Sequence, residues 1–325
     1  MSAHPAQPTL FDPDTPNVEP TVEPVLTAEP IVAEPTTGEP PSQTSDPGRV
    51  VPTRRISFDE TLANLPKHFA GDGDLIMSHL AAGLSSTFPE GEEFFIRSVR
   101  RYRDQITDPK LKRQVAGFIG QEAVHGREHR VMNARLDALG YPASANEKRV
   151  KRGLGLQERL TSAEACLAHT AAVEHITATL AELILTNADV RASFGPEVGP
   201  VFTWHALEES EHKAVAFDVY RAVGGSERER VRMMRLTRWA FVVSTTLQVG
   251  ASLLGDRTTY QRGRLRTSWR RFKASPIMQR ELWDQLKDYE RPDFHPDDSD
   301  TTELVATWRA ELFGDTGTLQ HLLAG

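Results

Sequence analysis

Two pairs of residues in the sequence have the spacing of metal ligands on one helical face. Glu122 is followed three residues later by His125, and Glu209 is followed three residues later by His212. Residues three apart on an α-helix lie about 4.5 Å apart along the axis, on the same side. A carboxylate and an imidazole in that arrangement can bind one divalent metal ion. Each pair alone is a weak signal, because Glu-x-x-His recurs by chance, but two copies indicate a shared site.

Both pairs fall within the apolar stripe of an expected helix. Positions spaced alternately by four and three run through 109–139, and only the middle of the series is polar. These positions are Leu111, Val115, Phe118, Glu122, His125, His129, Met132, Leu136 and Leu139. The other stripes have fewer polar members: Glu92 in 89–106, Glu174 in 160–188, and His205, Glu209 and His212 in 197–223. Four helices are therefore expected to direct acids or histidines inward.

Burying these groups without partners would destabilise the core. An isolated buried carboxylate is very costly, and the cost falls when the carboxylate is paired or bound to metal. No lysine or arginine occupies the middle of the four stripes. One glutamate from each of two helices, plus Glu-x-x-His from each of two others, is the arrangement of dinuclear sites in ferritin-like bundles. The sequence therefore predicts a centre that holds two divalent metal ions.

Positioning these residues requires long helices with defined ends. Asp108-Pro109 has the signature of a helix start, and Gly140 has that of a helix end. We find no strand-like alternation and predict an all-α fold, a ferritin-like four-helix bundle with additional N- and C-terminal helices. The expected helices cover 74–86, 89–106, 109–139, 160–188, 197–223, 227–254, 276–290 and 301–313.

The N-terminal region differs in composition from the rest of the chain. Of 325 residues, 38 are Lys or Arg and 45 are Asp or Glu, which gives a net charge of −7. Residues 1–50 contain eight acids and one base, so this segment carries the whole excess. Because it is also rich in proline, we predict a disordered acidic tail over 1–53 and one helical metal-binding domain over 54–325.

Other features limit the compartment and the kind of site. The single cysteine, Cys166, excludes an intramolecular disulfide and a cysteine-rich zinc site. No uncharged apolar run reaches the roughly 18 residues of a spanning helix. The N-terminus lacks the basic and apolar regions of a secretory signal, so we expect a cytoplasmic protein.

One basic segment bears on the partners of the protein. Residues 221–273 contain 13 Lys or Arg and three acids, and they include the uncharged stretch 239–254. This stretch is either a core helix that covers the bundle or a peripheral contact with an anionic membrane. No readout motif accompanies the charge, so we expect no nucleic-acid partner. We expect a small-molecule substrate, and a homodimer stays open. The expected pocket residues are Phe95, Val99, Phe118, Thr170, Thr177 and Phe202.

Four stretches of the chain resemble a known family. They are FPEGEEFFIRSVRRYRDQI, QEAVHGREH, AHTAAVEHITA and HALEESEHKAVAFDVY, and together they are similar to the bacterial predicted metal-dependent hydrolases. The resemblance covers roughly residues 55–290. It implies a ferritin-like fold and a metal centre. The family name asserts hydrolysis, whereas the motifs themselves do not show it.

The site also resembles, more distantly, that of the di-iron aryl-amine N-oxygenases. Those bundles carry an additional histidine four residues before the last Glu-x-x-His, and His205 has that spacing. The ligands that this resemblance implies are Glu92, Glu122, His125, Glu174, His205, Glu209 and His212. His129 has no counterpart there, and it is either a partner behind a ligand or an eighth ligand.

Several chemistries fit such a centre. Carboxylate and imidazole ligands suit iron first, with manganese or zinc as alternatives. Our first interpretation is an O2-activating oxidase or oxygenase acting on a small or apolar molecule. In it, Glu122 and Glu209 bridge the ions, and the remaining glutamates and Glu-x-x-His histidines are terminal. The alternative is a hydrolase that uses a metal-activated water on an ester or a phosphate.

Two further interpretations have less support. His125-Gly-Arg-Glu128-His129 fits the inverted zincin pattern, with Glu128 as general base, although Glu128 lies off the stripe. A non-catalytic metal-binding protein, for storage or structure, is the other.

Overall fold

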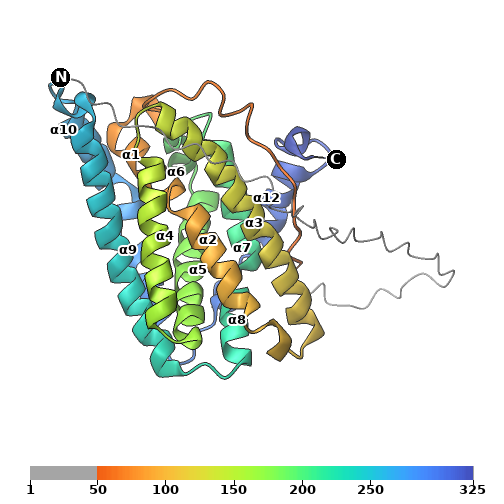
Figure 1. Cartoon of the computed structure of the whole chain (residues 1–325). Helices are drawn as coiled ribbons and strands as arrows, with labels where there is room; N and C mark the ends of the chain where they lie inside the picture. Colours follow the sequence, from red (N-terminus) through yellow and green to blue (C-terminus); the bar gives the residue numbers. More distant parts are fainter. Residues whose placement is uncertain (1–49, 325) are drawn as a thin grey trace, which may run out of the picture. The chain divides into compact units, whose positions relative to one another are not determined.

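The computed structural model describes residues 50–324 and is all-α, as predicted (Figure 1). Within this range the only β pairing is an isolated bridge between Ile56 and Leu323. The helices are α1 Leu75–Ser85, α2 Phe88–Arg100, α3 Pro109–Ala138, α4 Ala143–Leu160, α5 Ala163–Thr186, α6 Ala188–Ser193, α7 Gly199–His212, α8 Val215–Ala222, α9 Glu227–Gly255, α10 Arg264–Ala274, α11 Arg280–Asp288 and α12 Thr302–Phe313. Nearly all of the predicted acidic tail lies outside the described residues.

The four helices that carry the acids and histidines enclose a common interior. Helix α2 packs against α3 and α5, and α7 packs against the same two helices. Each of the four therefore contacts two of the others, as in a four-helix bundle. The ferritin-like classification of this bundle stays a prediction.

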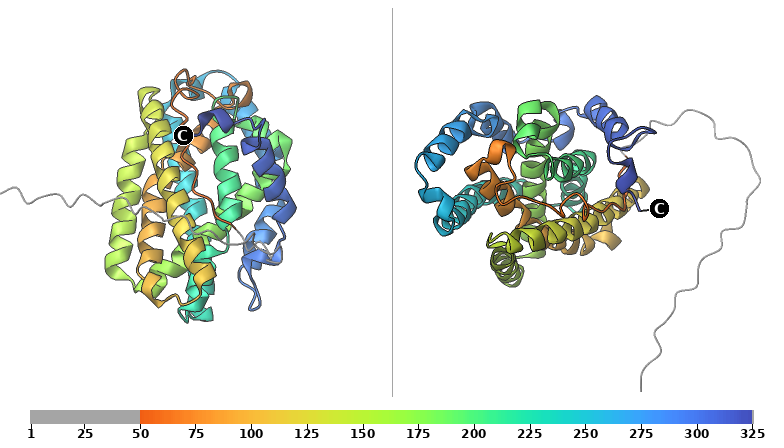
Figure 2. Two further views of the ribbon diagram at one scale, coloured as in Figure 1. Left: turned by 90° about the vertical axis from the view of Figure 1, so that its right-hand side faces the viewer. Right: turned by 90° about the horizontal axis from the view of Figure 1, so that it is seen from above.

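The C-terminal helices cover the outside of the bundle. Helix α9 packs against α1 and α5, and α12 packs against α7 and α5. Figures 1 and 2 show α9 along one side of the bundle and α12 along another. No helix in the described part of the chain combines the length and apolarity needed to cross a membrane.

The predicted helix boundaries around α3 are confirmed. The side chain of Asp108 accepts hydrogen bonds from the backbone N–H groups of Lys110 and Leu111, and Pro109 is the first helical residue. Gly140 follows the helix with φ of +90°, a conformation that favours glycine. These signals fix where the Glu122–His125 pair falls along the bundle.

Several elements differ from the sequence prediction. Helices α4 and α10 were not predicted, because their sequences are predominantly polar and they bury only two residues and one residue, respectively. The helix expected over 197–223 is interrupted at Lys213 and Ala214, which separate α7 from α8. The helix expected over 89–106 ends at Arg100.

An extended segment, residues 50–56, leads into the fold along α3. A Cβ placed on Gly117 would lie 2.1 Å from the carbonyl oxygen of Val51, and one on Gly120 would lie 2.0 Å from Oγ1 of Thr53. Only glycine permits so close an approach. Val51 and Thr53 thus pack on the bundle, a few residues before the domain boundary expected at Arg54. This packing brings Arg54 to the interior.

Candidate metal centre

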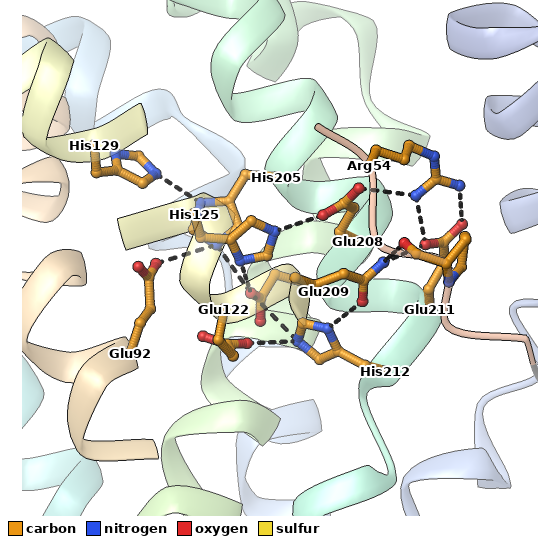
Figure 3. Close-up of polar contacts among 12 residues, drawn as sticks. Arg54, Glu92, Glu122, His125, His129, His205, Glu208, Glu209, Glu211 and His212 are labelled. Atoms are coloured by element: carbon orange, nitrogen blue, oxygen red, sulfur yellow. Dashed lines mark hydrogen bonds and ion pairs between the residues drawn. The ribbon is translucent and has the colours of Figure 1, made fainter. Parts of the chain in front are cut away.

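The structure brings all seven predicted ligands together inside the bundle, and Figure 3 labels all of them except Glu174. Each is at most 5% exposed. Six of these side chains form two groups whose ligand atoms lie within 4.8 Å of one another. The first group is Glu92, His125 and His205, and the second is Glu122, Glu209 and His212. Glu174 joins the second group, because its Oε2 lies 3.2 Å from Nε2 of His212.

Glu209 lies between the two groups. Its Oε1 is 2.9 Å from Nε2 of His205 and 3.5 Å from Nδ1 of His125, both in the first group. The same oxygen is 3.5 Å from Nε2 of His212 in the second group. His212 Nε2 also lies 3.1 Å from Oε1 of Glu122. Oε1 of Glu209 is therefore within reach of the nitrogen atoms of both groups.

Most polar atoms that face this interior make no hydrogen bond, although Oε1 of Glu209 pairs with Nε2 of His205. Both carboxylate oxygens of Glu92, Glu122 and Glu174 are buried and make no hydrogen bond, and neither does Oε2 of Glu209. Nδ1 of His125 and Nε2 of His212 are in the same condition. Buried polar groups are ordinarily paired, and unpaired carboxylates are costly. These oxygen and nitrogen atoms therefore fit a pair of divalent cations.

The carboxyl groups divide into neutral and charged members when no cation is bound. Burial and the neighbouring acids raise the pKa of Glu92 and Glu122 well above the ordinary range. Burial and Glu209 raise the pKa of Glu174 to about 7. Burial also opposes the charge on Glu209, but His212 and His205 outweigh it and hold its pKa well below the ordinary value. The metal-free centre thus stores protons that cations would displace.

Two histidines are oriented by partners on the far side of the ring. Nε2 of His125 lies 3.0 Å from Oε2 of Glu208, and Nδ1 of His212 lies 2.8 Å from Oε1 of Gln121. The amide group of Gln121 donates to Oε2 of Glu211, so its oxygen is the atom that faces His212. Because the outer nitrogens hold protons, Nδ1 of His125 and Nε2 of His212 are the nitrogens that face the centre. Burial opposes a charge on His212, but Glu209 and Glu174 outweigh it and raise its pKa, so a cation would displace the proton from Nε2.

The third histidine is oriented by a hydrogen-bonded chain. The hydroxyl of Ser85 donates its hydrogen to Oδ1 of Asn133, at 2.8 Å. The Ser85 oxygen must therefore accept from Nδ1 of His129, at 3.0 Å. His129 Nε2 must then accept from Nδ1 of His205, at 2.8 Å. His205 Nε2 is therefore the nitrogen left to face Glu209, with which it forms a hydrogen bond of 2.9 Å in the absence of a cation. A bound cation would replace that proton. Both ring nitrogens of His129 are engaged, which favours its role as a partner behind His205 over that of an eighth ligand.

An arginine from outside the bundle completes the layer behind these ligands. Arg54 binds Oε1 of Glu208 at 2.8 Å and Oε1 of Glu211 at 2.6 Å, and both glutamates are fully buried. Burial opposes the arginine charge, yet Glu211 and Glu208 raise its pKa above the usual range. Arg309 from α12 also binds Glu211. Burial raises the pKa of Glu208, and Arg54 opposes that shift by favouring the carboxylate that accepts from His125.

Residues 52–300 match the family described as predicted metal-dependent hydrolases. The chain belongs to this family. No curated protein and no solved structure gave a significant match. The resemblance to the metal-dependent hydrolases is thus confirmed, while the resemblance to the aryl-amine N-oxygenases stays a prediction. Among the two main interpretations, the match supports the hydrolase alternative and does not support the oxidase.

The inverted zincin arrangement is not present in this member of the metal-dependent hydrolase family. The carboxylate of Glu128 accepts from the backbone N–H of Phe58 at 2.8 Å and from Arg127 at 2.8 Å, so it points away from the clustered ligands. His129, the second zincin ligand, is held behind His205. The sequence pattern is therefore coincidental.

The expected pocket residues divide between two regions of this hydrolase-family protein. Thr177 and Phe202 line an apolar cavity that reaches His205 and Glu209. Phe118 instead packs edge-on against His212, with ring centroids 5.0 Å apart. Phe95, Val99 and Thr170 lie among the buried residues on the opposite side of the ligands. The stripes predicted that these residues are interior, but could not tell which of them face a cavity.

Proposed function

We propose that this protein is a hydrolase that holds two divalent cations and cleaves a carboxylic ester. Membership of the metal-dependent hydrolase family supports the reaction class. The observation that carries the metal requirement is the convergence of seven unpartnered carboxylate oxygens, from four helices, on three histidine nitrogens. That donor set suits iron or manganese, with zinc as the alternative.

The proposed ligands fall into two sets that share Glu209. Glu92, His125 and His205 would hold one ion, and Glu122, Glu174 and His212 would hold the other. Bound cations supply Lewis acidity, which polarises a carbonyl and lowers the pKa of a coordinated water. Glu208, Gln121 and His129 keep the three ring lone pairs turned inward by holding the outer ring protons.

The surroundings of the centre favour an ester over a phosphate. The cavity beside His205 and Glu209 has no lysine or arginine in its described lining. Phosphate recognition ordinarily uses arginine, lysine or a row of backbone N–H groups. A neutral ester needs none of these to enter.

Oxidation of an apolar molecule is a second candidate, which the apolar lining of the same cavity favours. Metal analysis together with an oxygen requirement separates the two. We expect two equivalents of metal per chain, and cleavage of 4-nitrophenyl esters that proceeds equally with and without O2. Stoichiometric O2 consumption with no anaerobic turnover would instead establish the oxidase.

Two alanine variants test the ligand assignment directly. His212→Ala should lose metal, because its nitrogen contacts three of the four carboxylates. The matched control is Glu93→Ala, whose side chain is 44% exposed and pairs with Arg130 on the surface. Retention of both metal equivalents by His212→Ala would contradict the proposed centre.

A further inference from the structure

An apolar cavity opens directly onto the candidate metal centre. It has a volume of about 70 Å³, and its lining comes mainly from α1, α5 and α7. Protein interiors are close-packed, and voids larger than a water molecule are few. A cavity of this size that ends on two of the clustered ligands, His205 and Glu209, is therefore a candidate substrate site.

The polar groups of the cavity are confined to one end. Thr177, His205 and Glu209 are the only polar residues in its described lining. The hydroxyl of Thr177 donates to the backbone carbonyl of Glu174, so it offers no donor to a ligand. The remaining lining is aliphatic or aromatic, and includes Leu80, Ile184 and Phe194. A ligand that fits has one reactive polar end and an apolar remainder.

The length of the cavity limits the length of the apolar part of the ligand. Along α5 its lining extends from Thr177, one turn beyond Glu174, to Ile184. Seven residues of α-helix span about 10 Å, which is close to the length of an extended chain of roughly eight carbons. The volume of about 70 Å³ is about half of the roughly 150 Å³ that holds a benzene ring, so such a chain enters only when side chains of the lining move. Met77 and Leu180 line the same space and can change rotamer to admit such a chain.

The cavity also borders the outer layer of the protein. Phe241 of α9 and Ile277, which follows α10, contribute to its lining, and both are half-buried. Next to Phe241, Trp239 and Val242 are exposed on α9. An apolar substrate would thus meet apolar side chains both outside and inside the protein.

We propose that the substrate is an ester with a medium-length aliphatic acyl chain, which lies in this cavity with its carbonyl at the metal centre. The reaction in this inference rests on the proposed hydrolase function, whereas the acyl chain of the substrate is inferred from the cavity alone. Activity should therefore rise with acyl length from acetyl toward octanoyl, and a filled cavity should remove that preference.

The test compares the same alanine-to-leucine substitution at a position inside the cavity and at one outside it. Ala181 is buried and lines the cavity, whereas Ala188 is exposed at the start of α6. Ala181→Leu should lower kcat/KM for 4-nitrophenyl octanoate about 10-fold, the effect of one overpacked side chain, and leave the acetate within about 2-fold. Ala188→Leu should behave as the wild type with both esters. Leu180→Ala, which enlarges the cavity, should move the optimum toward longer chains.

A binding measurement separates this inference from the proposed reaction. 1-Octanol should raise the Tm of the metal-loaded wild type and of Ala188→Leu, but not that of Ala181→Leu. If no ester is cleaved and 1-octanol still stabilises in this pattern, the cavity inference stands and the hydrolase proposal fails. If esters are cleaved with no dependence on acyl length in any variant, the cavity inference fails and the hydrolase stands.

Discussion

Replacing Glu174 by glutamine should stabilise the metal-free protein while weakening its metal binding. In the folded protein, burial and Glu209 raise the pKa of Glu174 from 4.5 to about 7. Between these values the folded state keeps a proton that the unfolded state has lost, so the free energy of unfolding falls as the pH rises. Glutamine has no proton to lose and avoids this penalty.

The magnitude follows from the size of the pKa shift. Each pKa unit corresponds to about 1.4 kcal/mol, so the shift from 4.5 to about 7 costs the wild type about 3 kcal/mol once the pH exceeds 7. Relative to the wild type, metal-free Glu174→Gln should therefore gain about 3 kcal/mol across this pH range. An added cation reverses the order, because it requires the carboxylate that only the wild type supplies.

Urea unfolding of chelator-treated protein at pH 5 and pH 8, followed by circular dichroism, measures this difference. The control is Glu93→Gln, whose half-exposed side chain should change stability by less than about 0.5 kcal/mol at either pH. If Glu174→Gln follows the wild type at both pH values, burial does not hold the proton. The inference that burial and Glu209 keep Glu174 protonated in the metal-free centre would then be wrong.

Three further predictions concern the layers around the centre. Arg54→Met should cost about 3 kcal/mol in urea unfolding, because it leaves buried Glu208 and Glu211 short of a cation, while the exposed neighbour Arg55→Met should cost little. His129→Phe should weaken metal binding about 10- to 100-fold in a chelator competition, rather than abolish it, because His129 only orients His205. We also propose that the exposed apolar face of α9 binds anionic membranes, because it lies in a segment of net charge +10. A second copy of the protein would carry the same charge on this face and would be repelled. Trp239→Ser should reduce salt-sensitive co-sedimentation with phosphatidylserine vesicles, and equal binding to neutral vesicles would contradict this.

The positions of the clustered ligands could be predicted from the sequence because helical periodicity is a local property. Glu122 and Glu209 occupy stripes in which every neighbouring position is apolar or histidine, so their inward direction is visible without a structure. The same reasoning predicted single inward acids at Glu92 and Glu174, and the structure places all four together.

The layer behind the ligands could not be predicted in this way. Glu208 and Gln121 lie one position off the stripes, and both have partners in a segment remote in sequence. Arg54 binds Glu208, and the carbonyl oxygen of Pro52 accepts from Gln121. Nothing in the local pattern around Arg54 indicates that partner. Helix α4 escaped prediction for the opposite reason, since its polar sequence forms a helix with almost no buried face.

The close fit between residues 50–56 and α3 has a practical consequence. Gly117 and Gly120 let this segment lie directly on α3, where it holds the positive charge of Arg54 against Glu208. A shortened protein that starts after residue 56 would keep every proposed ligand. It would lose Arg54, which holds the Glu208 carboxylate that orients His125. Trimming the N-terminus to improve expression or crystal growth should therefore stop before Val50.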